Sequence, residues 1–299
     1  MPPEFFVYLP QMRLTPDQLV ERSRAAEAAG FAGIAGMDHL VPPQAEDKPM
    51  YEAMVANTWI AAHTQHLRIG SLVLCDSFRH PATLAREAVS LDHCSQGRFE
   101  LGIGWGSVVR EMGMFDAGSL EARERLGRFR ETLEILKGLW AGETLDYDGE
   151  HFTMRGARQE PLPLGHIPIV IGGVGKTTME LVAAHADWWN IHTGVLGSLD
   201  RLEELRASAG NARASLQLSV ALVTSEDERE HVNELAQRRF NQRAVVGNAT
   251  ELVDRFGALE ARGIERMYVW FCDFAAPDTL AAFGEDVIAP MAASSGGLR

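Results

Sequence analysis

The residues best suited to chemistry are the neighbours Asp38 and His39, which follow a short apolar segment at residues 33–37. A histidine beside a carboxylate can move a proton near neutral pH. The pair can also be a helix cap or a hydrogen-bonded core histidine, and the two residues taken alone favour that structural role. Acid–base chemistry is therefore indicated only if other functional residues converge on them.

Repeated helix–glycine–strand junctions supply the framework. Amphipathic helices are predicted over 15–30, 80–96 and 248–262, each followed by a glycine and a short strand. The eight predicted strands are apolar runs at 5–9, 33–37, 67–74, 98–103, 168–172, 187–192, 216–223 and 266–271. Apolar strands that alternate with helices indicate a parallel sheet covered on both faces, and eight such units favour a closed (β/α)8 TIM barrel.

One segment departs from this alternation. Residues 142–166 follow the longest predicted helix, 119–141, and contain the hairpin-type pair Asp148-Gly149. We interpret them as a small β excursion between the fourth helix and the fifth strand. No linker or shift in composition divides the chain, which predicts one domain over 1–293 and a disordered tail over 294–299.

The ends of the predicted strands are rich in polar, glycine and aromatic residues. These are Cys75 and Arg79 after the third strand, Gly102 to Ser107 after the fourth, Gly172 to Thr177 after the fifth, and Trp188 to His192 along the sixth. Active sites of (β/α)8 barrels lie at the carboxyl ends of the strands. We therefore expect these residues to gather around Asp38 and His39.

Two glycine-containing strings resemble nucleotide motifs without matching them. The string Gly175-Lys176-Thr177 lacks the earlier glycine of a Walker A loop, because that position is Val170. The string Gly102 to Gly106 lacks the third glycine of a dinucleotide fingerprint, because that position is Ser107. Both loops can still bind an anion through backbone N–H groups, or can simply allow close packing.

Composition excludes several classes of protein. The chain of 299 residues has a formal net charge of −13, which argues against nucleic-acid binding. It contains neither an apolar run of about 18 residues nor a signal-peptide pattern, so we expect a cytoplasmic protein that does not enter the membrane. Cys75, Cys94 and Cys272 are widely spaced, and we expect Cys94 and Cys272 to be reduced core residues. No metal-ligand spacing is visible, so no metal site is predicted.

Taken together, the strand-end strings resemble the luciferase-like flavin-dependent oxidoreductases and monooxygenases, especially the deazaflavin (coenzyme F-420)-dependent branch. The resemblance covers residues 15–290. The strings that carry it are Asp38-His39-Leu40, Phe78-Arg79-His80-Pro81, Gly97-Arg98-Phe99, Gly102 to Gly106, Glu134 to Trp140, Ile167 to Gly173 and Ala186 to Asn190.

The resemblance implies roles for individual residues. His39 is the expected catalytic proton donor or polarising group, and Asp38 is expected beside it against the cofactor ring. A non-proline cis peptide is expected at Leu72–Val73, with Cys75 beside the cofactor side chain. The remaining cofactor contacts that it implies are Trp105, Gly106, Ser107, Arg110, Gly172, Gly173 and Lys176. We expect Trp189, His192 and Phe271 to line the substrate pocket.

One position departs from the pattern. Sugar-phosphate dehydrogenases of this group have an acid–base glutamate where this chain has Ser107, which argues against sugar-phosphate oxidation. The asparagine contact of those enzymes matches Arg110, which we expect to bind the anionic tail of the cofactor. Arg79, Arg110 and Lys176 are together expected to form a basic rim despite the net charge.

The resemblance implies an oxidoreductase that uses coenzyme F-420 for hydride transfer to or from a small organic substrate, and that forms a homodimer. A monooxygenase that uses reduced FMN and molecular oxygen is the first alternative. A non-catalytic flavin-binding protein is the second, because a catalytic base is missing at Ser107.

Overall fold

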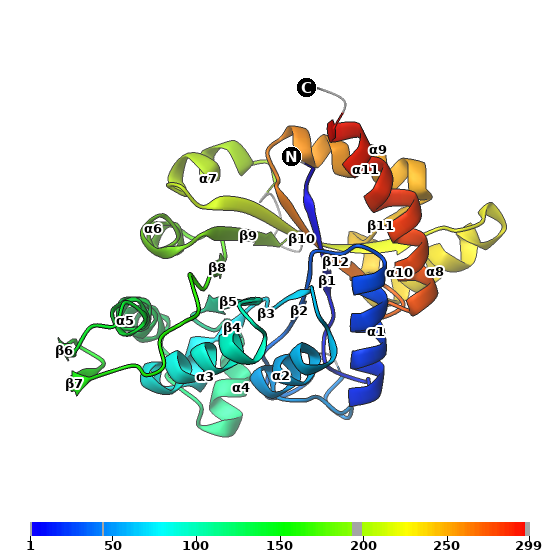
Figure 1. Cartoon of the computed structure of the whole chain (residues 1–299). Coiled ribbons are helices and arrows are strands. Elements are labelled where there is room, and N and C mark those ends of the chain that lie inside the picture. The colour runs from blue at the N-terminus through cyan, green and yellow to red at the C-terminus, as the bar shows by residue number, and fades with distance from the viewer. Residues whose placement is uncertain (1, 44, 193–198, 297–299) are drawn as a thin grey trace.

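The computed structural model describes residues 2–43, 45–192 and 199–296. Its centre is a closed parallel barrel of eight strands, around which the helices are arranged (Figure 1). In order around the ring, the strands are β1 (Glu4–Tyr8), β2 (Gly33–Gly36), β3 (Arg68–Ser71), β5 (Phe99–Gly104), β8 (Ile169–Gly172), β9 (Trp188–His192), β10 (Arg213–Leu222) and β12 (Arg266–Phe271). The pairing of β12 with β1 closes the ring. The predicted (β/α)8 barrel is confirmed.

The predicted helices are also present. The helices outside the barrel are α1 (Pro16–Ala28), α2 (Ala53–His63), α3 (Pro81–Cys94), α5 (Ala122–Trp140), α6 (Lys176–His185), α7 (Leu202–Ser208), α8 (Arg229–Phe240), α9 (Ala249–Ala261), α10 (Pro277–Phe283) and α11 (Ala289–Gly296). Thr15 and Gln18 form a capping box at the start of α1. Asn248 and Glu251 form another at the start of α9. These caps satisfy N–H groups that would otherwise lack partners.

The predicted excursion is a two-stranded antiparallel hairpin of β6 (Leu145–Asp148) and β7 (Thr153–Ala157), outside the barrel sheet. Among the elements for which no range was predicted are β4 (Leu74–Cys75), α4 (Val109–Phe115) and β11 (Val245–Gly247). Helix α11 continues to Gly296, within the range 294–299 that was expected to be a disordered tail. Residues 297–299 lie outside the described part of the chain.

Side chains alternate along each strand between the barrel interior and the helical layer. On β9, Trp188 packs in the interior cluster with Phe6 and Tyr268. Its neighbour Trp189 packs in the large cluster between strands and helices. This alternation decides which residues of a strand can reach a site at the barrel mouth.

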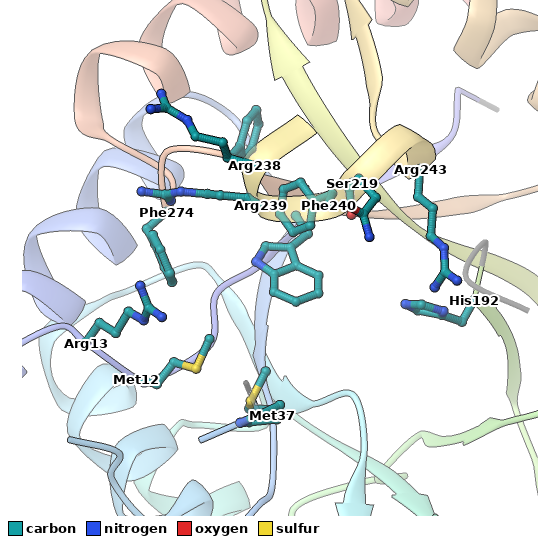
Figure 2. A pocket seen from close by; sticks show the side chains of 14 residues that line it. Met12, Arg13, Met37, His192, Ser219, Arg238, Arg239, Phe240, Arg243 and Phe274 are labelled. Carbon is teal, nitrogen blue, oxygen red and sulfur yellow. The ribbon is translucent and has the colours of Figure 1, made fainter. Parts of the chain in front are cut away.

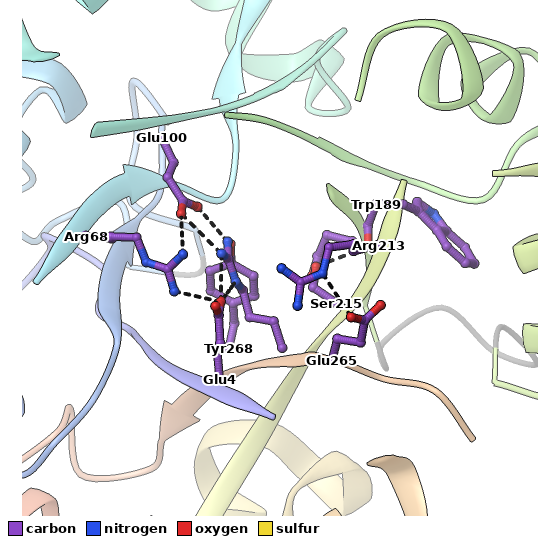
Figure 3. A network of polar contacts seen from close by, with 10 residues as sticks. Glu4, Arg68, Glu100, Trp189, Arg213, Ser215, Glu265 and Tyr268 are labelled. Atoms are coloured by element: carbon purple, nitrogen blue, oxygen red, sulfur yellow. Dashed lines mark hydrogen bonds and ion pairs between the residues drawn. The ribbon is translucent and has the colours of Figure 1, made fainter. Parts of the chain in front are cut away.

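The amino-terminal end of the barrel interior is filled by a polar network (Figure 3). Arg266 is fully buried and donates hydrogen bonds to Glu100 and to Glu4, the latter at 2.8 Å. Arg68 also pairs with Glu4, at 2.7 Å. The Arg266 guanidinium lies 3.7 Å from the ring centroid of Trp188. Because this end of such barrels is usually structural, we assign the network to stability.

Candidate active site

A cavity of ≈ 560 Å³ lies at the carboxyl ends of the strands. Eleven of the predicted site residues line it: Asp38, His39, Leu72, Val73, Cys75, Trp105, Gly106, Ser107, Gly172, Gly173 and His192. The cavity is also lined by four residues that were not predicted, namely Tyr8, Asn190, Gln217 and Trp270. All eight barrel strands or the loops that follow them therefore contribute to one site, as the strand-end argument predicts.

His39 is held by a carboxylate that was also not predicted. Its Nδ1 lies 3.0 Å from Oε1 of Glu111, and Oε2 of Glu111 accepts the N–H of Leu40 at 3.1 Å. The Glu111 side chain is 6% exposed, whereas that of His39 is 23% exposed. An ionised carboxylate can only accept hydrogen bonds, so it places the proton of His39 on Nδ1. Nε2 is then the nitrogen available to a ligand.

Asp38 has a positioning role. Its Oδ2 accepts the N–H of Cys75 at 2.8 Å and a hydrogen bond from Arg79 at 2.5 Å. Arg79 also contacts Glu52 and lies 3.6 Å from Glu87. These contacts tie the loop after β2 to β4 and α2. Because the guanidinium of Arg79 is already paired with carboxylates, this residue does not contribute an unpaired positive charge to the expected basic rim.

The cavity wall after β3 is apolar. The peptide Leu72–Val73 is cis, as expected. A Cβ on Gly104 would lie 3.0 Å from Cγ2 of Val73, so the glycine leaves space for the side chain of Val73. Gly106 has φ +83°, and a Cβ there would lie 2.3 Å from Cε of Met112. Burial raises the pKa of the Cys75 thiol to about 12, so this residue contributes a neutral surface and no thiolate.

Four of the predicted site residues do not line this cavity. Arg110 is exposed and paired with Glu46, and Lys176 is exposed at the start of α6; neither lines the cavity. Trp189 faces the helices, and its Nε1 donates to the carbonyl of Gly173 at 2.7 Å. Phe271 lines a neighbouring cavity, but its ring packs on the helix side, 5.1 Å from that of Phe283.

Two of the cavity residues that were not predicted are sequence neighbours of residues that were. Trp270 lies at the cavity and precedes Phe271, while Asn190 lies there and follows Trp189. Two-residue alternation along β9 and β12 could have indicated them if the inward positions had been known. Glu111 lies four residues beyond Ser107, on the unpredicted α4. Its signal in the sequence was a carboxylate soon after a strand end.

The described residues lack some other kinds of site. They contain no group of three or more histidine, cysteine, aspartate or glutamate side chains able to hold a metal ion. No helix among them is both long and apolar enough to cross a membrane.

Comparison with known proteins identifies the family. The chain is 32% identical to an F420-dependent glucose-6-phosphate dehydrogenase of Mycolicibacterium fortuitum, over 58% of this chain and 53% of the relative. It is 29% identical to a protein of the same name from Rhodococcus erythropolis, over 69% of this chain and 61% of the relative. The chain thus spans just over half the length of these curated relatives.

Its fold is similar to that of an F420-dependent secondary alcohol dehydrogenase, with a TM-score of 0.79 and 16% identity over 97% of this chain and 99% of the other. The family model described as luciferase-like monooxygenase matches residues 2–232. The chain therefore belongs to the luciferase-like monooxygenase family.

Proposed function

We propose that this protein is an oxidoreductase that uses the deazaflavin coenzyme F-420 to transfer a hydride to or from a small organic substrate. The main support is the His39–Glu111 pair, which faces a cavity formed by residues from all eight strands. The names of the curated relatives favour this coenzyme.

The cavity has the features that a planar ring with a phosphate-bearing side chain requires. Leu72, Val73 and Leu74 supply an apolar wall. Gly172, Gly173 and Gly175 also line the cavity, and α6 begins there with Gly175 as its N-cap and no side-chain cap. The uncapped N–H groups of a helix start suit a phosphate. The residues present therefore fit the coenzyme.

Bound deazaflavin supplies a ring carbon that accepts or delivers a hydride. The work of the chain is to hold the reactants and to move a proton. Glu111 fixes the ring of His39 through Nδ1, so that Nε2 can accept a proton from the substrate or return one. Glu111 thus provides a buried carboxylate although Ser107 replaces the glutamate of the sugar-phosphate enzymes.

Titration of the purified protein with coenzyme F-420 and with FMN tests this proposal. We expect quenching of deazaflavin fluorescence and tighter binding of coenzyme F-420 than of FMN. Equal or tighter binding of FMN would instead support the monooxygenase that uses reduced FMN. If coenzyme F-420 binds but no substrate reduces it, the non-catalytic flavin-binding protein becomes the better proposal.

We also propose that two copies of the chain form a homodimer through a groove between α2 and α3. The groove has a volume of ≈ 970 Å³, and Val55 and Trp59 on its wall are 69% and 44% exposed. Contiguous exposed apolar residues favour protein association. Cys94 also lines this groove and is exposed, which corrects the expectation that it is a core residue. We further propose that the protein acts in the cytoplasm, because free cysteines such as Cys75, Cys94 and Cys272 are usual in a reducing compartment.

A further inference from the structure

A second cavity, of ≈ 530 Å³, adjoins the first at the barrel mouth (Figure 2). We call it the arginine chamber, because Arg13, Arg238, Arg239 and Arg243 line it. Both cavities have Met37, Pro43, His192 and Trp270 in their linings. The arginine chamber is therefore next to the proposed coenzyme cavity, on the side of β10 and β12.

The charge of the chamber is unusual for this protein. The chain has a net charge of −13, yet none of the four arginines forms an ion pair within 4.0 Å in the described part of the chain. Burial lowers the pKa of Arg239, and the like charges of Arg13 and Arg238 lower it further, against the effect of Asp273. Like charges that are held together without an ion-pair partner favour an anionic ligand.

The chamber also has an aromatic wall. The ring of Trp270 lies 4.8 Å from that of Phe240, in an edge-to-face arrangement, and 5.2 Å from that of Tyr8. The guanidinium of Arg239 lies over the ring of Phe274, 4.5 Å from its centroid. Aromatic rings and a stacked guanidinium favour a flat apolar ligand body.

Three residues of the chamber have a backbone conformation that is rare for residues other than glycine. The φ angles of Arg13, Asn241 and Phe274 are 64°, 53° and 62°. Such positions are enriched at ligand-binding sites. They place residues from three separate loops around one space.

We propose that the arginine chamber binds the substrate, and that this substrate is an organic anion with a flat apolar body. The acid group lies among the arginines, and the body lies along Trp270 and Phe240 toward the shared wall at His192. This inference rests on the proposed function, because the coenzyme must occupy the neighbouring cavity for the substrate to react.

The anionic tail of coenzyme F-420 is the competing occupant. The glycine-lined side of the coenzyme cavity, at Gly172 to Gly175 and the start of α6, does not contribute to the arginine chamber. A phosphate bound by these glycines would start the tail on that side, and the arginines would be left to a second anion.

Calorimetric titration with 2-naphthoate, a flat apolar carboxylate, tests the proposal on protein saturated with coenzyme F-420. Its neutral counterpart 2-naphthalenemethanol and the polar anion glucose 6-phosphate are the comparison probes. We expect 2-naphthoate to bind more tightly than both. Arg239→Gln and Arg243→Gln should each weaken its binding about tenfold or more, as loss of a charge-assisted hydrogen bond does. The matched control is Arg255→Gln, which removes the same charge from an exposed site on α9 and should change nothing.

Each variant is also titrated with coenzyme F-420 and followed by thermal unfolding. Unchanged coenzyme affinity and unfolding temperature, together with lost naphthoate binding, support the chamber as the substrate site. If the arginine variants weaken binding of coenzyme F-420 instead, the tail occupies the chamber and the proposal is wrong. It is equally wrong if 2-naphthoate does not bind, or binds no better than the neutral probe. If wild-type protein does not bind coenzyme F-420, the proposed function is wrong. Binding of 2-naphthoate can then still be measured without the coenzyme, so the two failures are distinguishable.

Discussion

The central residue of the site is His39, because its Nε2 is the nitrogen left to a ligand once Glu111 holds Nδ1. Replacing it with alanine should slow turnover of coenzyme F-420 by about 10²–10⁴, the usual contribution of general acid–base catalysis. Coenzyme affinity should change much less. Steady-state rates and fluorescence titration of the same preparation separate the two effects. Unchanged activity per folded molecule would remove His39 from the mechanism.

Glu111 is predicted to act only through His39. Glu111→Gln removes the negative charge but retains an acceptor oxygen, so kcat should fall by a smaller factor than in His39→Ala, with coenzyme affinity retained. In a double-mutant cycle, Glu111→Gln should have little further effect once His39 is alanine, because residues that act as a unit are not additive. Independent losses would assign Glu111 a role of its own.

Asp76 is predicted to set a pH dependence of stability. Burial raises its pKa from 3.8 to about 6, although Arg128 opposes this shift. The unfolded chain therefore releases this proton at lower pH than the folded chain, and the free energy of unfolding falls as pH rises from 3.8 to about 6. Asp76→Asn should abolish this part of the decline and stabilise the protein at pH above 6. Denaturant unfolding at several pH values measures it, with Asp254→Asn on the exposed face of α9 as the control. A variant less stable than wild type throughout contradicts the prediction.

At the scale of elements, the barrel was predictable because helix caps, glycine ends and apolar strands recur in the sequence. What the sequence does not show is the inward parity of each strand. Strands β9 and β12 have large aromatic residues on both faces, so nothing in Trp188-Trp189 or Trp270-Phe271 marks the interior residue. The chosen Trp189 and Phe271 both face the helices. The positions of these strands were therefore predicted correctly, but the residues expected at the pocket were one position away from those that face it.

Short elements were the other limit. The helix α4 has seven residues and no side-chain cap, so neither periodicity nor a capping signal predicts it, yet it carries Glu111. The arginines on α8 similarly resemble a solvated helix face in the sequence. Only the closed barrel brings them to Arg13, more than 200 residues away in the chain. Contacts over such separations depend on the register of the whole fold.

The groove between α2 and α3 makes a prediction about assembly. Val55→Asp places a charge on a side chain that is 69% exposed, so the monomer should fold normally. If this face is the dimer interface, the Val55→Asp variant should be monomeric at a concentration at which the wild-type protein is dimeric, because burying an unpaired charge is costly. Light scattering at micromolar protein measures this shift. Leu164→Asp, at a residue that is 57% exposed outside the groove, is the matched control. A monomeric wild-type protein, or a dimer unaffected by Val55→Asp, contradicts the assignment.

For the whole molecule, the barrel separates stability from function along its axis. The described lining of the two cavities comes from the carboxyl ends of the strands and from the loops and helices that follow them. The charged network of Arg266, Glu100, Glu4 and Arg68 lies at the opposite end of the barrel. Substitutions in this network should therefore change the free energy of unfolding without changing the chemistry of the folded protein.

Arg266→Met tests this separation. It leaves the buried carboxylate of Glu100 without its main partner, and breaking a buried pair in this way typically costs about 3–5 kcal/mol. The pKa of Glu4 is lowered because Arg266 and Arg68 outweigh the effect of burial. This part of the stabilisation is present above pH 4.5 and is lost as pH falls through the lowered pKa, so the deficit of the variant should shrink in acid.

The matched control is Arg213→Met, which breaks a half-exposed pair with Glu265 at the same end of the barrel. Exposed pairs contribute at most about 1 kcal/mol, so this loss should be the smaller one. Denaturant unfolding gives both free energies, and coenzyme titration and turnover are measured on the folded fraction. An Arg266→Met protein that unfolds like wild type, or that remains folded but loses coenzyme binding, contradicts the division of the barrel into a structural end and a functional end.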